Sequence, residues 1–167
     1  MQDLGLFLSI AEIAGVFVGF GALISLLRDQ QNEGRLAVHA VIANGLVALV
    51  AALIPVALSQ YGLTGRALWG WSSGAFLLLC WAAIWGGFHN PEIRDAAKVD
   101  AKANPVLTVG FWGLLEAPLQ LPLVLILLGI GATHARALYF TALVMCLVQA
   151  AFLLGRAVFS RVPSKAL

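Results

Sequence analysis

The sequence predicts an all-α integral membrane protein, built as a bundle of five transmembrane helices in a single domain over residues 1–167. Three observations predict this class. The chain is 61% hydrophobic and only 11% charged, whereas soluble domains carry about 25% charged residues. Its mean hydropathy is +0.94. Its apolar residues are gathered in five runs, each about as long as a helix needs to be to cross a bilayer. The runs cover residues 4–27, 36–59, 67–88, 106–132 and 136–159, and a polar segment at 89–105 separates the third run from the fourth.

The first run, residues 4–27, combines one acidic residue with a pair of glycines. Gly15 and Gly19 have the GxxxG spacing, which allows another helix backbone to approach closely. At about 100° per residue, Glu12 falls on the same side of the helix as both glycines. We therefore expect this side to contact protein rather than lipid, with Gly15 and Gly19 as helix-packing residues.

The second and third runs are apolar along most of their length. Asn44 lies inside the second run, and tryptophans near both ends of the third run are typical of the two membrane interfaces. The polar segment at 89–105 begins with Asn90-Pro91-Glu92, a sequence typical of a helix start. The segment fits either a short amphipathic helix on the membrane surface or a solvated loop.

The fourth run carries most of the intramembrane chemistry. Glu116 and Gln120 lie one helical turn apart, and Pro118 and Pro122 alternate with them. Because each proline removes an N–H donor and crowds the carbonyl four residues before it, we expect a kink here. The fifth run holds one further polar residue, Gln149, near its middle.

The distribution of basic residues predicts the orientation. With the N-terminus outside and the C-terminus inside, only Arg66 and Arg136 fall in outward loops, so the inner side holds eight of the ten Lys and Arg residues. The loops are short, and short loops follow the positive-inside rule most closely. We expect a multi-pass protein of a bacterial inner membrane.

The polar residues inside the runs are the candidate functional residues. A charge at the centre of a bilayer costs about 2.5–3.5 kcal/mol on insertion scales, so intramembrane carboxyls mark function or a specific partner. One interpretation is a polar path for an ion or proton. The other is hydrogen bonding between helices, which would leave the carboxyls neutral. The candidates are Glu12, Glu116, Gln120, Asn44 and Gln149.

The ends of the chain carry a resemblance. The stretch AEIAGVFVGFGALISLLRD, a second run ending in ALIP, and the final ALYFTALVMCLVQAAFLLGR together resemble a set of small bacterial inner-membrane proteins of unknown function. This resemblance implies a bacterial inner-membrane location and a significance for Glu12 and Gly19-Phe20. It implies no activity.

Two functions follow from these features. The first is assembly within the bilayer, as a homo-oligomer or as an accessory subunit of a membrane complex, because the small-residue faces suit close helix contact. The alternative is a small oligomeric ion or proton channel or transporter that uses the intramembrane glutamates. We expect no enzyme, since no nucleophile accompanies a base. We also expect no cofactor, metal site or nucleic-acid partner, because Cys/His clusters and basic aromatic patches are missing.

Overall fold

The computed structural model describes residues 2–27, 35–103 and 105–159, and these residues form helices and turns without any strand. The all-helical prediction is therefore confirmed. The helices are α1 (Gln2–Leu27), α2 (Arg35–Gln60), α3 (Gly65–His89), α4 (Pro91–Ala103), α5 (Pro105–Gly110), the π-helix η1 (Phe111–Glu116), α6 (Ala117–Leu127), the 3₁₀ turn η2 (Ala132–His134) and α7 (Ala135–Phe159).

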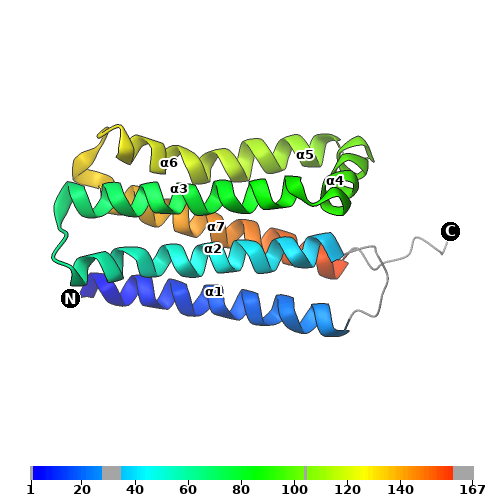
Figure 1. Cartoon of the computed structure of the whole chain (residues 1–167), viewed down its shortest axis with the longest axis horizontal. Coiled ribbons are helices and arrows are strands. Elements are labelled where there is room, and N and C mark those ends of the chain that lie inside the picture. Colours follow the sequence, from blue (N-terminus) through cyan, green and yellow to red (C-terminus); the bar gives the residue numbers. More distant parts are fainter. Residues whose placement is uncertain (1, 28–34, 104, 160–167) are drawn as a thin grey trace.

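The long helices lie side by side along one axis, and α4 crosses one end of the bundle (Figure 1). We call this the α4 end. It also holds the end of α1, the start of α2 and the end of α7. The opposite end holds the start of α1, the α2–α3 turn and the start of α7 (Figure 1).

Four of the described helices are long and apolar enough to cross a membrane. These spans are Gly5–Leu26, Val38–Gln60, Gly65–His89 and Ala132–Arg156. The stretch corresponding to the predicted fourth run contains a shorter apolar helix, Gly113–Leu127. The structure thus supports a membrane-embedded helical protein.

The helix formed by the predicted fourth run ends before residue 132. Helix α6 ends at Leu127, and Gly129, two residues later, has a positive φ of 77°. The N–H of Ile130 donates to the Leu125 carbonyl at 2.9 Å, and the N–H of Gly129 donates to Ile126 at 3.0 Å. These two bonds form a Schellman motif, in which a left-handed glycine turns the chain away from the helix axis. Hydropathy alone missed this end because the residues after it are still apolar.

Pro118 accounts for the irregular turn in this stretch. Pro118 lies in the first turn of α6, where its missing N–H is tolerated, and the π-helix η1 ends two residues before it. In a regular α-helix Pro118 would crowd the carbonyl of Leu114, so the turn before it widens. The expected kink therefore takes the form of a π-helical turn. Pro122 is accommodated inside α6 and is buried.

The tightest approaches between α1 and α2 are at Gly21 and Gly45. A Cβ on Gly45 would lie 2.8 Å from Val18 Cγ2, and one on Gly21 would lie 2.8 Å from Ile42 Cγ1. At these distances an added Cβ would force the Val18 or Ile42 side chain to shift. By contrast, a Cβ on Gly15 would lie 3.8 Å from Leu49, and one on Gly19 would have no neighbour within 4 Å. The GxxxG pair is therefore not what holds α1 and α2 together.

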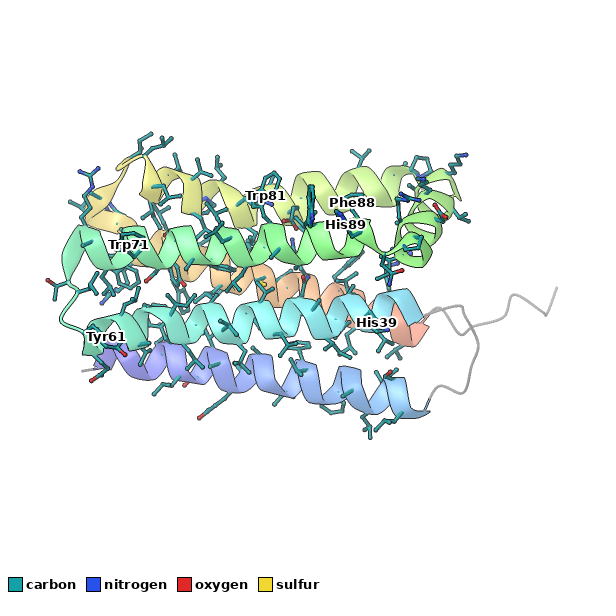
Figure 2. The ribbon with its side chains drawn as sticks, in the orientation of Figure 1. His39, Tyr61, Trp71, Trp81, Phe88 and His89 are labelled. Atoms are coloured by element: carbon teal, nitrogen blue, oxygen red, sulfur yellow. The ribbon has the colours of Figure 1, made fainter. Side chains whose placement is uncertain are left out.

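Aromatic side chains fill the core toward the end opposite α4. The rings of Tyr139 and Phe76 lie 5.7 Å apart, and both residues are fully buried. We call these rings the aromatic cluster; its members are Phe7, Trp69, Phe76, Tyr139 and Phe140. Trp69 therefore packs inside the bundle, whereas Trp71 and Tyr61 are exposed at the same end (Figure 2).

The Tyr139 hydroxyl has a structural role at Pro55. It donates to the Ala51 carbonyl at 2.6 Å. In an α-helix that carbonyl would accept from the N–H of residue 55, but residue 55 is a proline inside α2. Pro55 has no N–H to give, so Tyr139 from α7 satisfies the carbonyl that Pro55 leaves without its helical partner. Neighbouring helices commonly supply such partners inside membranes.

Candidate intramembrane binding site

A hydrogen-bonded cluster joins α2, η1, α6 and α7 near the middle of the bundle. Gln149 Nε2 donates to Glu116 Oε2 at 2.8 Å, and Gln120 Nε2 donates to Glu116 Oε1 at 2.6 Å. Asn44 Nδ2 in turn donates to Gln149 Oε1 at 3.2 Å. Four of the five intramembrane polar candidates are thus in one network, which we call the Glu116 cluster.

Helix geometry brings these residues together from distant parts of the sequence. Glu116 is the last residue of η1, and Gln120 follows it by one turn, so both side chains reach the same face. Cys146 and Gln149 are three residues apart on α7, and both turn inward to contact Asn44: the Cys146 thiol lies 3.6 Å from the Asn44 carbonyl. Each oxygen of Glu116 accepts one amide N–H, so the carboxyl is supported on both sides.

A cavity of about 760 Å³ lies against this cluster. That volume lies within the range of pockets that enclose small molecules. Asn44, Glu116 and Gln149 contribute its polar wall, and most of the other lining residues are apolar. The lining residues are His39, Ala40, Ala43, Asn44, Val47, Cys80, Ala83, Ile84, Gly86, Gly87, Phe88, Ile93, Arg94, Ala97, Lys98, Ala101, Glu116, Leu119, Cys146, Gln149, Leu153 and Arg156.

The cavity changes character from its buried to its exposed part. At the buried part, Gln149 is only 2% exposed and Cys146 only 1%. Toward the α4 end the lining includes His39, Arg94 and Lys98, and the Lys98 side chain is 63% exposed. Figure 2 places His39 at this end, on α2. The cavity therefore leads from an exposed mouth at the α4 end to the partly buried Glu116 cluster.

One face of α4 forms part of this mouth. Ile93, Ala97 and Ala101 recur every four residues and line the cavity, and Arg94 and Lys98 form the adjacent row. The helix begins at Pro91, after Asn90, as the Asn-Pro-Glu sequence predicts. Of the two alternatives left open for residues 89–105, the helix is the one observed.

Glu12 lies apart from the cluster. It is exposed on α1, on the side that also carries exposed Ile13, Val16 and Gly19. No described residue of the bundle covers this side of α1 at Gly19, since a Cβ there would meet nothing within 4 Å. The side of α1 that carries Glu12 and Gly19 is therefore on the outer surface of the bundle, accessible to a partner.

Two further features of the sequence do not form catalytic or metal sites in the described residues. Ser72 and Ser73 are fully buried, and neither hydroxyl has a hydrogen-bond partner there. Among residues 2–27, 35–103 and 105–159, no three His, Cys, Asp or Glu side chains are close enough to hold a metal ion.

Sequence reasoning missed several residues of the cavity. Cys80 and Cys146 line its buried part, although as lone cysteines in apolar runs they carried no motif. The spacing of Cys146 could have identified it, because it precedes Gln149 by three residues and shares its helix face. Arg94, Lys98 and Arg156 entered the sequence argument only as markers of orientation, yet they also line the mouth.

Comparison of the chain with protein-family models, with curated proteins and with solved structures found no match. The candidate site therefore rests on the geometry of this chain.

Proposed function

We propose that the chain crosses a bacterial inner membrane five times, with its N-terminus outside and its C-terminus inside. Four spans are long apolar helices, and α5, η1 and α6 together would form the fourth crossing in sequence order. This stretch runs from Pro105 to Leu127, and 23 helical residues extend about 34 Å, enough to cross the hydrocarbon core. The excess of Lys and Arg at the α4 end supports its placement in the cytoplasm.

Single cysteines test this topology in a variant whose two native cysteines are replaced by alanine. We expect a cysteine at Thr64 to react with a membrane-impermeant maleimide from the periplasm, and one at Lys98 to react only from the cytoplasm. A cysteine at Thr133 should also react from the periplasm, because in the five-span arrangement α5, η1 and α6 cross the membrane before it. Labelling at positions 64 and 98 from one side would contradict the five-span arrangement, and labelling of position 133 from the cytoplasm would reduce the count to four.

We propose that the protein is a small membrane transporter in which Glu116 binds the proton or cationic group that crosses. The single observation behind this proposal is the cavity that leads from the α4 end to the Glu116 cluster. A carboxyl used only for helix packing needs no such access, whereas a carboxyl that exchanges a proton or cation does.

The aromatic cluster supports a transporter rather than a permanently open channel. Tyr139 lies ten residues before Gln149 on α7, so it is about 15 Å further along the bundle. Its ring packs with Phe76 and Phe7, all of them buried, between the Glu116 cluster and the far end. A species bound at Glu116 could leave toward that end only after this packing changes.

Proton flux into liposomes tests the proposed function. We expect the wild-type protein to acidify vesicles that contain a pH-sensitive dye when a proton gradient is applied. Glu116→Gln should abolish this flux, because an amide does not titrate at these pH values. The control is the double variant Glu116→Gln/Gln120→Glu, which returns a titratable carboxyl one turn away and should regain part of the flux. Equal flux through wild type and Glu116→Gln would contradict the role of Glu116.

A second candidate function, assembly in the bilayer, is favoured by the exposed position of Glu12. A carboxyl facing lipid is costly, and a partner helix that covers it lowers this cost. Gly19, two turns further along the same side of α1, leaves room for a second backbone. We propose that this face of α1 contacts a second copy or a partner subunit of a larger complex.

The Gly19 face can be tested without disturbing the inner packing of the bundle. We expect Gly19→Leu to lower the assembled fraction in mild detergent several-fold, because the added side chain separates the contacting helices. Size-exclusion chromatography with light scattering measures this fraction. Gly70→Leu is the control, since a Cβ at Gly70 also meets nothing within 4 Å but lies on α3. An unchanged profile for Gly19→Leu would mean that this face contacts lipid.

A further inference from the structure

Two serines of α3 are buried without hydrogen-bond partners. Ser72 and Ser73 are fully buried, and the hydroxyl of neither has a partner among the described residues. The buried amide of Gln149, by contrast, is bonded to both Asn44 and Glu116. A buried hydroxyl without a partner costs free energy, so packing alone does not explain why this position of the core carries two of them.

Neither serine hydroxyl is bonded to its own helix. A serine or threonine inside a helix commonly donates to the carbonyl four residues before it, as Thr141 does to the Ala137 carbonyl at 2.9 Å. Ser72 and Ser73 make no such bond. Each hydroxyl has one hydrogen to donate and two lone pairs that accept, and this capacity is available to a bound molecule.

The two serines lie beside the aromatic cluster. Trp69, Ser72, Ser73 and Phe76 are spaced by three and four residues, so they share one face of α3. The ring centroid of Tyr139 lies 5.7 Å from that of Trp69 and 5.7 Å from that of Phe76. Because Trp69 and Phe76 are two turns apart, the Tyr139 ring lies beside the turn between them, which is the turn that carries both serines.

The same face of α3 leads from the serines to the cavity. Cys80 follows Phe76 by four residues and lines the cavity, as Glu116 does. Ser73 precedes Cys80 by two turns, which is roughly 10 Å along the helix. Phe76, which is fully buried, lies between them. The serines are therefore the next polar groups on this face beyond the cavity, toward the end opposite α4.

Building on the proposed function, we infer that Ser72 and Ser73 hydrogen-bond the water that carries a proton between Glu116 and the end opposite α4. Water reaches them when the rings of Phe76 and Tyr139 separate, and water inside proteins binds where buried polar groups lack other partners. A hydroxyl accepts a hydrogen bond through a lone pair and donates its own hydrogen. A proton that arrives on one side therefore leaves as a different hydrogen on the other, and each serine keeps one hydrogen. The serines are positioning residues, and Glu116 is the group that titrates.

Proton flux into liposomes tests the inference with the double variant Ser72→Ala/Ser73→Ala. We expect flux to fall about tenfold or more, because the water in transit loses both hydroxyls. Ser59→Ala is the matched control, since the Ser59 hydroxyl already donates to the Val56 carbonyl of its own helix at 2.7 Å. Wild-type flux in the double variant, or an equal loss in Ser59→Ala, would overturn the inference.

Thermal stability separates this role from a packing role. The melting temperature of Ser72→Ala/Ser73→Ala in detergent should equal or exceed that of the wild type, because alanine removes two hydroxyls that have no partner. A lower melting temperature would assign the serines to packing and overturn the inference.

Thiol reactivity tests water access at the serines independently of transport. In the variant whose native cysteines are replaced by alanine, we expect Ser73→Cys to react with 2-aminoethyl methanethiosulfonate several-fold faster than Ala14→Cys, because the reactive thiolate needs water. Ala14 is equally buried, in the contact of α1 with α2. Equal rates would overturn the inference. Wild-type flux in the double serine variant together with none in Glu116→Gln overturns only this inference, whereas flux that survives Glu116→Gln overturns the proposed function.

Discussion

Replacing Tyr139 with alanine is expected to lower the free energy of unfolding by about 3–5 kcal/mol, the range seen when a buried aromatic ring is removed from a core. Tyr139 is fully buried, and its ring centroid lies within 6.1 Å of those of Phe7, Trp69 and Phe76. Unfolding in a mixed-micelle titration with a denaturing detergent measures the change.

The hydroxyl contributes separately from the ring. Tyr139→Phe keeps the packing but removes the bond to the Ala51 carbonyl, and a buried acceptor left without a partner costs about 1–3 kcal/mol. Pro55→Ala returns an N–H to that carbonyl, so the cost of Tyr139→Phe should shrink in the Pro55→Ala background. This double-mutant cycle isolates the coupling. Strictly additive effects would show that the hydroxyl does not serve the carbonyl freed by Pro55.

Glu116→Leu is expected to destabilise the bundle by about 2–6 kcal/mol. Leucine leaves the amide N–H groups of Gln149 and Gln120 without their acceptor, and each orphaned buried donor costs about 1–3 kcal/mol. Gln149 is only 2% exposed, so water replaces its lost partner poorly. A thermal melt in detergent gives the direction and rough size of the loss.

Glu116→Gln should fold and assemble like the wild type, for a reason that lies in its neighbours. The Asn44 amide donates to Gln149, and the Gln149 amide donates to Glu116. All partners of Glu116 are amides, and an amide turned by 180° exchanges its donor for its acceptor. A glutamine at 116 can therefore donate to Gln149, which then donates to Asn44. Misfolding of Glu116→Gln, or a stable Glu116→Leu protein, would contradict this account of the cluster.

The helices of this protein could be predicted from hydropathy because the bilayer leaves little choice. Every backbone N–H and carbonyl inside it must be satisfied within the chain, so a long apolar run becomes a helix. The residues of the Glu116 cluster were also identifiable, since an isolated polar residue in such a run needs a partner. Four of the five candidates do meet, although nothing in the sequence specified which bonds they form.

Packing between helices decides which glycines lie in the contact between α1 and α2. The GxxxG pair of α1 was expected to lie in a contact, yet Gly19 is open within the chain while Gly21 and Gly45 make the tight approach to α2. The spacing indicates where two backbones can come close, but not which side of the helix faces a neighbour. That choice depends on the summed contacts of both helices.

By itself, the sequence determined that this chain is helical and apolar along five runs, with a few polar side chains inside them, because these properties depend on local hydropathy and on backbone hydrogen bonding. Four of the five runs form long helices. Only the tertiary structure decided that Glu116 and Gln149 face one cavity while Glu12 faces outward. It also decided that Tyr139 partners the carbonyl freed by Pro55, 84 residues away in the sequence. These outcomes depend on helix rotation and register, which the competing contacts of all helices set together.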